Sequence, residues 1–150
     1  NRIATANIGT EYTSTRVLDR ALMDRFEVIE VHILSKEREH VLLGKRFGDK
    51  VEDGLLESVA DIADVTRKEW RSDEGKLSTM ISTRMTVRIC ELLADGFTLE
   101  EASEVGILPF FDASGGADSE RLFVKQVIQK HLGTADEDIF NVGEEEKVEL

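Results

Sequence analysis

Polar and basic residues within the first 25 positions are suited to contact a phosphate group. Asn7 follows the apolar run 3–6, and an amide at the C-terminal end of a buried strand can hydrogen-bond a phosphate or orient an attacking water. Arg20 and Arg25 lie in a segment expected to be a short helix, from which a forked, permanently charged guanidinium could reach a phosphate across an interface. Taken singly, a turn-forming asparagine and surface salt bridges with neighbouring aspartates are the simpler explanations.

A third candidate site begins at Ser82-Thr83-Arg84, which opens an apolar helical pattern. An arginine in the first turn of a helix is locally unfavourable because the helix dipole is positive there. It becomes favourable if an anion binds at the same N-terminus and shares the backbone amides and the guanidinium. Arg88 lies one turn further along the same face. Without other information, two solvated arginines remain the simpler interpretation.

The sequence contains no phosphate-binding loop of the Gly-x-x-x-x-Gly-Lys-Ser/Thr type. Only Gly44-Lys45 and Gly75-Lys76 offer the Gly-Lys pair, and the first glycine of the motif is replaced by Glu39 in one case and by Trp70 in the other. Such a loop wraps phosphates with its backbone amides. No apolar strand ends in Asp-Glu to hold a magnesium ion either. We therefore expect the isolated chain not to hydrolyse ATP.

The elements expected to position these residues change in character along the chain. Apolar patterning predicts a strand over 1–6, a short helix over 16–25 and a strand over 26–33. Helices only are predicted after the N-cap residue Ser35: over 36–47, 55–70 and 82–94, then a short one opened by a capping box at Thr98 and a last one opened by Ser119. The apolar side of the second of these helices is predicted to be Leu55, Val59, Ile62, Ala63 and Val65. The expected fold is thus an α/β remnant followed by an all-α part. Because two strands do not make a stable sheet, and the first begins with the chain, we expect a fragment.

Composition limits the classes of function. The 150 residues are 41% hydrophobic and 33% charged, with a net charge of -12, which is typical of a soluble globular protein and argues against a general nucleic-acid grip. No apolar run approaches the length of a membrane span, so we expect a cytoplasmic protein without membrane contact. The last fifteen residues hold seven acids against one lysine, which predicts a solvated tail.

The remaining reactive residue types predict no site of their own. Cys90 lies within an apolar helical stripe, so a core thiol is expected. His32, His40 and His131 are scattered without ligand spacing, and no metal site is predicted. Trp70, Phe110 and Phe111 are expected to pack within the helical part.

The order of the candidate segments resembles that of one family. The run Ile3-Ala4-Thr5-Ala6-Asn7-Ile8-Gly9, then Thr13-Ser14-Thr15-Arg16, then Leu18 to Phe26 with Asp24-Arg25-Phe26, then Ser82-Thr83-Arg84, resembles AAA+ ATPases of the MoxR/CbbQ-like, dynein-related type. The resemblance implies that Asn7 is sensor 1, Arg25 the arginine finger and Arg84 sensor 2. From their places on the same two helices, Arg20 and Arg88 are expected to be further nucleotide contacts.

The resemblance also implies an organisation and partners. Residues 1–34 would be the C-terminal end of the AAA+ α/β core and 35–133 the helical lid. The resemblance ends there, and residues 134–150 are expected from their charge to be an acidic, disordered tail. ATP and Mg²⁺ would be held mainly by residues that this chain lacks. Identical subunits would form a ring, expected to be a hexamer, that remodels a protein partner. The alternative is a helical adaptor module that uses its acidic tail for contact.

Overall fold

The computed structural model describes residues 3, 5, 24–27 and 29–132, which divide between two compact units, 1–32 and 33–150. In the described part of the first unit, residues 24–26 form a turn and the other residues form neither helix nor strand. Ile29 and Val31 are 84% and 88% exposed. His32 lies 3.8 Å from Glu30, and both side chains are exposed.

The expected α/β part is wrong for the residues that the structure describes, which contain helices and no strand. The segment 26–33 was predicted as a strand from its alternating apolar residues, yet its described residues have no strand pairing. The physical reason is that a strand is stabilised by hydrogen bonds and side-chain pairs from a neighbouring strand. The described residues supply no such neighbour, so Ile29 and Val31 remain exposed.

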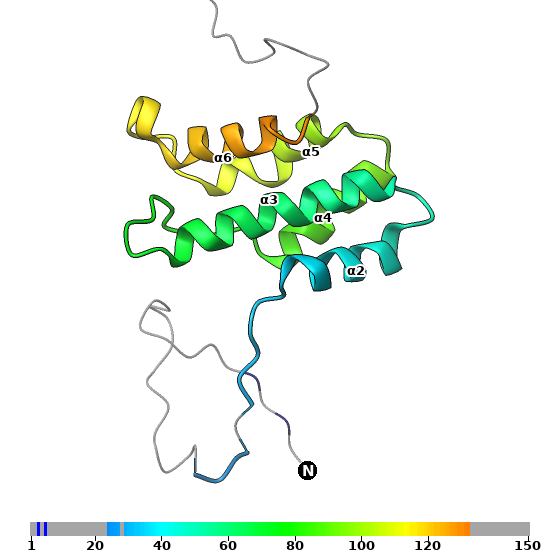
Figure 1. Cartoon of the computed structure of the whole chain (residues 1–150), viewed down its shortest axis with the longest axis vertical. Helices are drawn as coiled ribbons and strands as arrows, with labels where there is room; N and C mark the ends of the chain where they lie inside the picture. Colours follow the sequence, from blue (N-terminus) through cyan, green and yellow to red (C-terminus); the bar gives the residue numbers. More distant parts are fainter. Residues whose placement is uncertain (1–2, 4, 6–23, 28, 133–150) are drawn as a thin grey trace, which may run out of the picture. The chain divides into compact units, whose positions relative to one another are not determined.

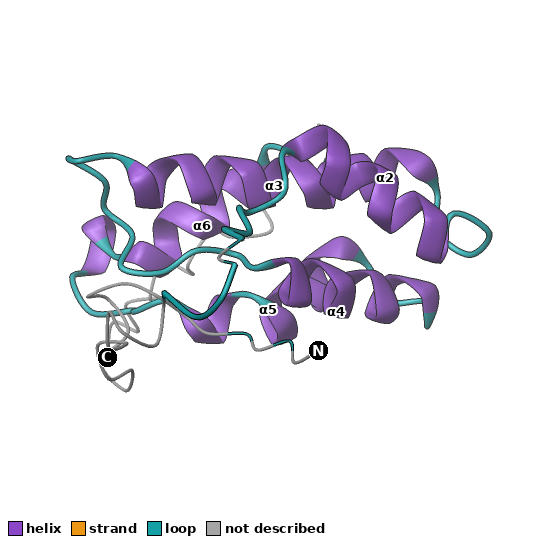
Figure 2. Ribbon diagram, turned by 90° about the horizontal axis from the view of Figure 1, so that it is seen from below, coloured by secondary structure: helices purple, strands orange, loops and turns teal. Residues whose placement is uncertain are grey.

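Over its described residues, 33–132, the second unit consists of helices joined by short connections, as the pattern after Ser35 predicts. Its elements in chain order are α2 (Lys36–Phe47), α3 (Asp53–Arg71), α4 (Thr83–Ala94), α5 (Leu99–Gly106), the 3-10 turns η1 (Leu108–Phe110) and η2 (Gly116–Asp118), and α6 (Glu120–Gln129). Figure 1 shows the longest helix, α3, lying between α2 and α6. In the view of Figure 2, α4 and α5 form a second layer beneath α2 and α3.

Side-chain caps fix where four of these helices begin. Ser35, Ser82 and Ser119 each accept a hydrogen bond from the backbone amide three residues further on. Thr98 does the same in a complete capping box, in which the Glu101 carboxylate accepts from the Thr98 amide at 2.9 Å. These bonds satisfy donors that a helix N-terminus leaves without partners. The predicted starts of these helices are therefore confirmed within a residue.

The end of α4 is set by Gly96, as the sequence predicts. Gly96 has a φ of 95°, in the left-handed region that glycine adopts without strain. Its amide donates to the carbonyl of Leu93, and the amide of Phe97 donates to the carbonyl of Leu92 at 3.1 Å. This pair of bonds is a Schellman motif, which satisfies carbonyls at the helix end.

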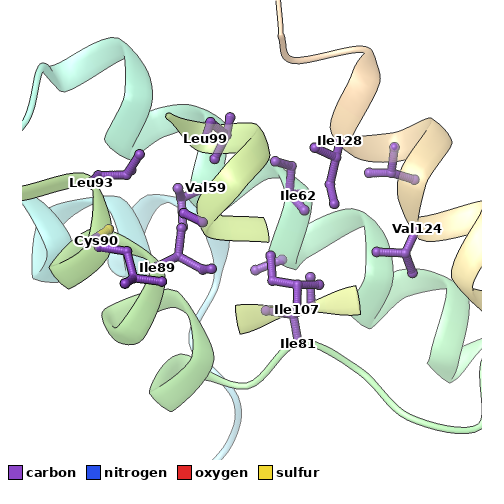
Figure 3. Packing of buried hydrophobic residues seen from close by; sticks show 14 of the residues in the cluster. Val59, Ile62, Ile81, Ile89, Cys90, Leu93, Leu99, Ile107, Val124 and Ile128 are labelled. Atoms are coloured by element: carbon purple, nitrogen blue, oxygen red, sulfur yellow. The ribbon is translucent and has the colours of Figure 1, made fainter. Parts of the chain in front are cut away.

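A single apolar core joins all the helices of the second unit. Figure 3 shows side chains from α3, α4, α5, α6 and the connections pointing toward one another. The labelled members are Val59, Ile62, Ile81, Ile89, Cys90, Leu93, Leu99, Ile107, Val124 and Ile128. Because buried apolar area contributes about 25 cal/mol per Å², this shared cluster is the main term that holds the helices together.

Three details of the predicted packing need correction or confirmation. Val65 was predicted to face inward but is 37% exposed, whereas Leu56 is fully buried. The inward stripe of α3 is thus rotated slightly from the prediction, since Leu56 continues to Val59 and Ala63 at helical spacing. Phe111 is buried, as predicted, but Phe110 is 62% exposed because η1 turns its side chain away from the core.

Several predictions fall on residues outside the described ranges. These are most of the strand over 1–6, of which only residues 3 and 5 are described, most of the helix over 16–25, and the acidic tail over 134–150. Within the described part of the chain, no helix is long and apolar enough to cross a bilayer.

Candidate functional site

The first turn of α4 carries the best-defined candidate site. Ser82 caps the helix, and its side chain accepts a hydrogen bond from the Met85 amide at 3.4 Å. The first turn contains no acidic residue. The side chain of Arg84 is exposed and makes no hydrogen bond or ion pair with any other described residue. No described carboxylate pairs with this guanidinium, so its positive charge adds to that of the helix N-terminus, an arrangement suited to an anion.

Arg88 lies one turn along the same helix, as the sequence predicts, but in a different electrostatic setting. Its guanidinium lies 3.6 Å from the Glu91 carboxylate, and both side chains are exposed. An exposed pair three residues apart contributes little free energy and breaks easily. Arg88 is thus partly neutralised where Arg84 is not.

A buried ion pair lies directly behind this turn. Glu39 of α2 and Arg67 of α3 are 0% and 2% exposed, and Arg67 Nη1 donates to Glu39 Oε2 at 3.1 Å. A buried charge is tolerated only when it is paired and hydrogen-bonded. Here the partners come from α4 and from the backbone just before α2 and α4.

Two hydroxyl groups of α4 complete the shell of the carboxylate. Thr83 Oγ1 donates to Glu39 Oε2 at 2.9 Å, and Thr86 Oγ1 donates to Glu39 Oε1 at 2.5 Å. The same hydroxyl lies 2.9 Å from the carbonyl of Thr83, so its single proton is shared between the two acceptors. One carboxylate of α2 therefore holds both the first residue of α4 and the residue one turn later.

The guanidinium of Arg67 binds the backbone on two sides. Its Nε donates to the Ile81 carbonyl at 2.9 Å, and its Nη1 donates to the Leu34 carbonyl at 3.2 Å. Ile81 leads into the N-cap of α4, and Leu34 leads into the N-cap of α2. The rigid fork of an arginine can hold two such points in a fixed relation, which a lysine could not.

The loop that precedes α4 is held by one carboxylate from α3 and one from α6. The Glu120 carboxylate accepts from the amides of Ser78 and Asp112, at 2.5 and 3.3 Å, and Glu69 Oε1 accepts from the Lys76 amide at 3.0 Å. Burial opposes ionisation of Glu120, but the bonds from Ser78 and Asp112 outweigh it and hold the pKa of this carboxyl below its ordinary value. The loop that leads into α4 is thus held in place by hydrogen bonds to side chains of α3 and α6.

The other predicted site residues lie elsewhere. Arg25 is exposed within the turn over 24–26, in the first compact unit, whereas Arg84 and Arg88 belong to the second. Asn7 and Arg20 lie outside the described residues. Of the predicted residues, the structure therefore brings Arg84 and Arg88 together on one face of α4.

Cys90 is a core residue, as predicted. It is fully buried, and burial, helped by the negative charge of Glu39, raises the pKa of its thiol to about 12. Since the thiolate is the reactive form, this thiol is unreactive in the folded chain.

Glu39 and Arg67 are the residues of this site that the sequence analysis missed. A signal was present, because Glu39 shares the helical stripe of Leu43 and Phe47, at intervals of four residues. Arg67 likewise follows Ala63 by four residues on the buried side of α3. A charged residue on an apolar stripe indicates burial with some partner, but the two stripes do not specify that Glu39 and Arg67 pair with each other.

Comparison with known proteins gives one informative similarity. No family model matches the chain. Over 99 residues, 66% of its length, the chain is 33% identical to a Thauera aromatica protein named Putative chaperone BssE. The chain spans about a third of the length of that relative, since the match covers 32% of it.

Proposed function

We propose that this chain is the sensor-bearing and lid part of a AAA+ ATPase of the MoxR/CbbQ-like kind, which hydrolyses ATP to remodel a protein partner. The observation that carries the proposal is Arg84, exposed and unneutralised by any described residue, in the capped first turn of α4. The order of the candidate segments and the chaperone name of the similar protein support it.

In this proposal each basic residue has a separate role. Arg84, as sensor 2, binds the phosphates of ATP held by the same subunit, and Arg88 contributes a weaker contact once it leaves Glu91. Arg25, as the arginine finger, stabilises the negative charge that develops on the phosphates bound to a neighbouring subunit. Asn7 orients the attacking water and Arg20 assists at the subunit interface. ATP and Mg²⁺ are held mainly by a phosphate-binding loop outside these 150 residues, and identical subunits assemble in a ring, which we expect to be a hexamer.

The direct test compares Arg84→Ala with Arg71→Ala in the full-length protein that carries this sequence. Both arginines are exposed on helices of the second unit. The two variants therefore remove the same charge from similarly exposed positions. Arg84→Ala should weaken nucleotide binding or lower turnover by roughly tenfold or more, the value of one charge-assisted contact, while Arg71→Ala should behave as wild type. Equal nucleotide binding and turnover in the two variants would show that Arg84 is not sensor 2.

A second test addresses Arg25, whose role depends on assembly. Arg25→Ala should lower the ATPase rate by about a thousandfold or more without changing nucleotide affinity to the same extent. Subunits carrying Arg25→Ala should regain hydrolysis when mixed with subunits that lack the phosphate-binding loop but retain Arg25. An Arg25→Ala protein with a wild-type rate would exclude the arginine-finger role and would favour the adaptor alternative.

A further inference from the structure

The buried carboxylate of Glu39 in α2 binds Thr83, the residue before Arg84 in α4. Thr83 directly precedes Arg84, and its hydroxyl donates to Glu39 at 2.9 Å. Helix termini are the parts of helices that open most readily. A side-chain bond from a rigid, buried acceptor to the first helical residue opposes that opening.

The same network also fixes the chain before the helix. Arg67 holds the carbonyl of Ile81 at 2.9 Å, and the hydroxyl of Thr66 accepts a hydrogen bond from the Ile81 amide at 3.4 Å. With Ser82 as the N-cap, every residue from Ile81 to Thr83 has at least one bond that defines its position. These bonds therefore fix the position of the Arg84 backbone, and only the side-chain torsions of Arg84 remain free.

The polar nature of the network points to a positional role. A buried ion pair is often no more stabilising than apolar side chains of the same volume. Hydrogen bonds differ from apolar contacts in being directional, and here they set α4 relative to both Ile81 and Leu34. A pre-ordered ligand contact binds more tightly because less conformational freedom is lost on binding.

We propose that Glu39, Arg67 and Thr83 are positioning residues that hold Arg84 in place for its anionic ligand. This inference rests on the proposed function, in which that ligand is the phosphate chain of ATP. None of the three residues needs to touch the nucleotide. Their effect on binding passes through Arg84 alone.

The variant Thr83→Val tests this with little disturbance, since valine has the shape of threonine and lacks only the hydroxyl. In the full-length protein, Thr83→Val should raise the dissociation constant for Mg-ATP by roughly threefold to tenfold, and Thr83→Ser should restore it. In the Arg84→Ala background the same Thr83→Val change should have no further effect. Val124→Ala, which alters the core in α6 away from α4, serves as the control for a general loss of stability and should leave the dissociation constant unchanged.

The outcomes separate this proposal from the proposed function. Equal weakening by Thr83→Val with and without Arg84, or no weakening at all, would overturn the positioning role. An Arg84→Ala protein that binds Mg-ATP normally would instead overturn the proposed function. The positioning role is then decided on the 150-residue chain without nucleotide, by the heteronuclear NOE of the backbone amides of residues 83–85. Thr83→Val should lower these values and Thr83→Ser should not, and unchanged values in Thr83→Val would refute the positioning role.

Discussion

Replacing Arg67 with methionine removes the countercharge of Glu39 while keeping most of the side-chain volume. In the folded protein Glu39 is fully buried and would retain only the hydroxyls of Thr83 and Thr86 as partners. The carbonyls of Leu34 and Ile81 would lose their donor at the same time. The variant therefore leaves a buried carboxylate without a cation and two backbone acceptors without their bonds.

The expected loss of stability comes from the buried charge that each single variant leaves without its partner. Removing one partner of a buried ion pair costs about 3–5 kcal/mol of the free energy of unfolding. Glu39→Leu should cost a similar amount because the Arg67 guanidinium would then be buried without an anion. The double variant Glu39→Leu/Arg67→Met removes both charges and should lie within about 2 kcal/mol of wild type. Its loss should thus fall short of the sum of the single losses by about 4 kcal/mol or more.

Urea unfolding of the 150-residue chain, followed by far-ultraviolet circular dichroism, measures these free energies. For a unit of this size 1 kcal/mol corresponds to roughly 4–8 °C in Tm, so each single variant should melt roughly 12 °C or more below wild type. The exposed Arg71→Met is the control and should change stability by no more than about 0.5 kcal/mol. Single losses below about 1 kcal/mol, or a double loss equal to their sum, would refute the buried coupling between Glu39 and Arg67.

Three further outcomes follow from local features of the fold. Gly96→Ala should lower the free energy of unfolding by about 1–2 kcal/mol in the same urea assay. The cost comes from the φ of 95°, which is strained for alanine, and not from a clash, since an added Cβ would meet no atom within 4 Å. An unchanged urea midpoint would contradict this. Cys90 should react with a thiol reagent at neutral pH only as fast as the chain opens, since it is buried and its pKa is raised to about 12, and rapid labelling of the folded chain would be inconsistent with that. Glu120 has a pKa lowered from 4.5, so its stabilising effect is complete above that value and is lost as the pH falls through the folded-state pKa. Urea midpoints of Glu120→Gln should therefore fall less steeply below about pH 4.5 than those of wild type, whereas Glu74→Gln, on an exposed loop, should follow the wild-type profile.

The helices of the second unit could be predicted because their signals are local. Each cap acts on an amide three residues away, so Ser35, Thr98 and Ser119 mark helix starts within a short window of sequence. Gly96 marks the end of α4 in the same way, through its own φ. Apolar periodicity then gives the inward face to within about one residue, which explains both the error at Val65 and the omission of Leu56.

The parts that could not be predicted depend on distant partners. An alternating apolar segment such as 26–33 becomes a strand only when another strand pairs with it, and the described residues contain none. Glu39 and Arg67 are 28 residues apart in the chain, so neither position alone indicates the pair. The candidate site shows the same division: Arg84 was identified from the helix that it opens, whereas the network that orients its turn became visible only in three dimensions.

The proposed function requires that Arg84 at the start of α4 binds the phosphates of ATP. The most direct measurement is the dissociation constant for Mg-ATP of the full-length protein carrying Arg84→Ala, set beside that of Arg71→Ala. Arg84→Ala alone should weaken binding by roughly tenfold or more, and equal affinities with unchanged turnover in both variants would show that Arg84 does not bind the nucleotide.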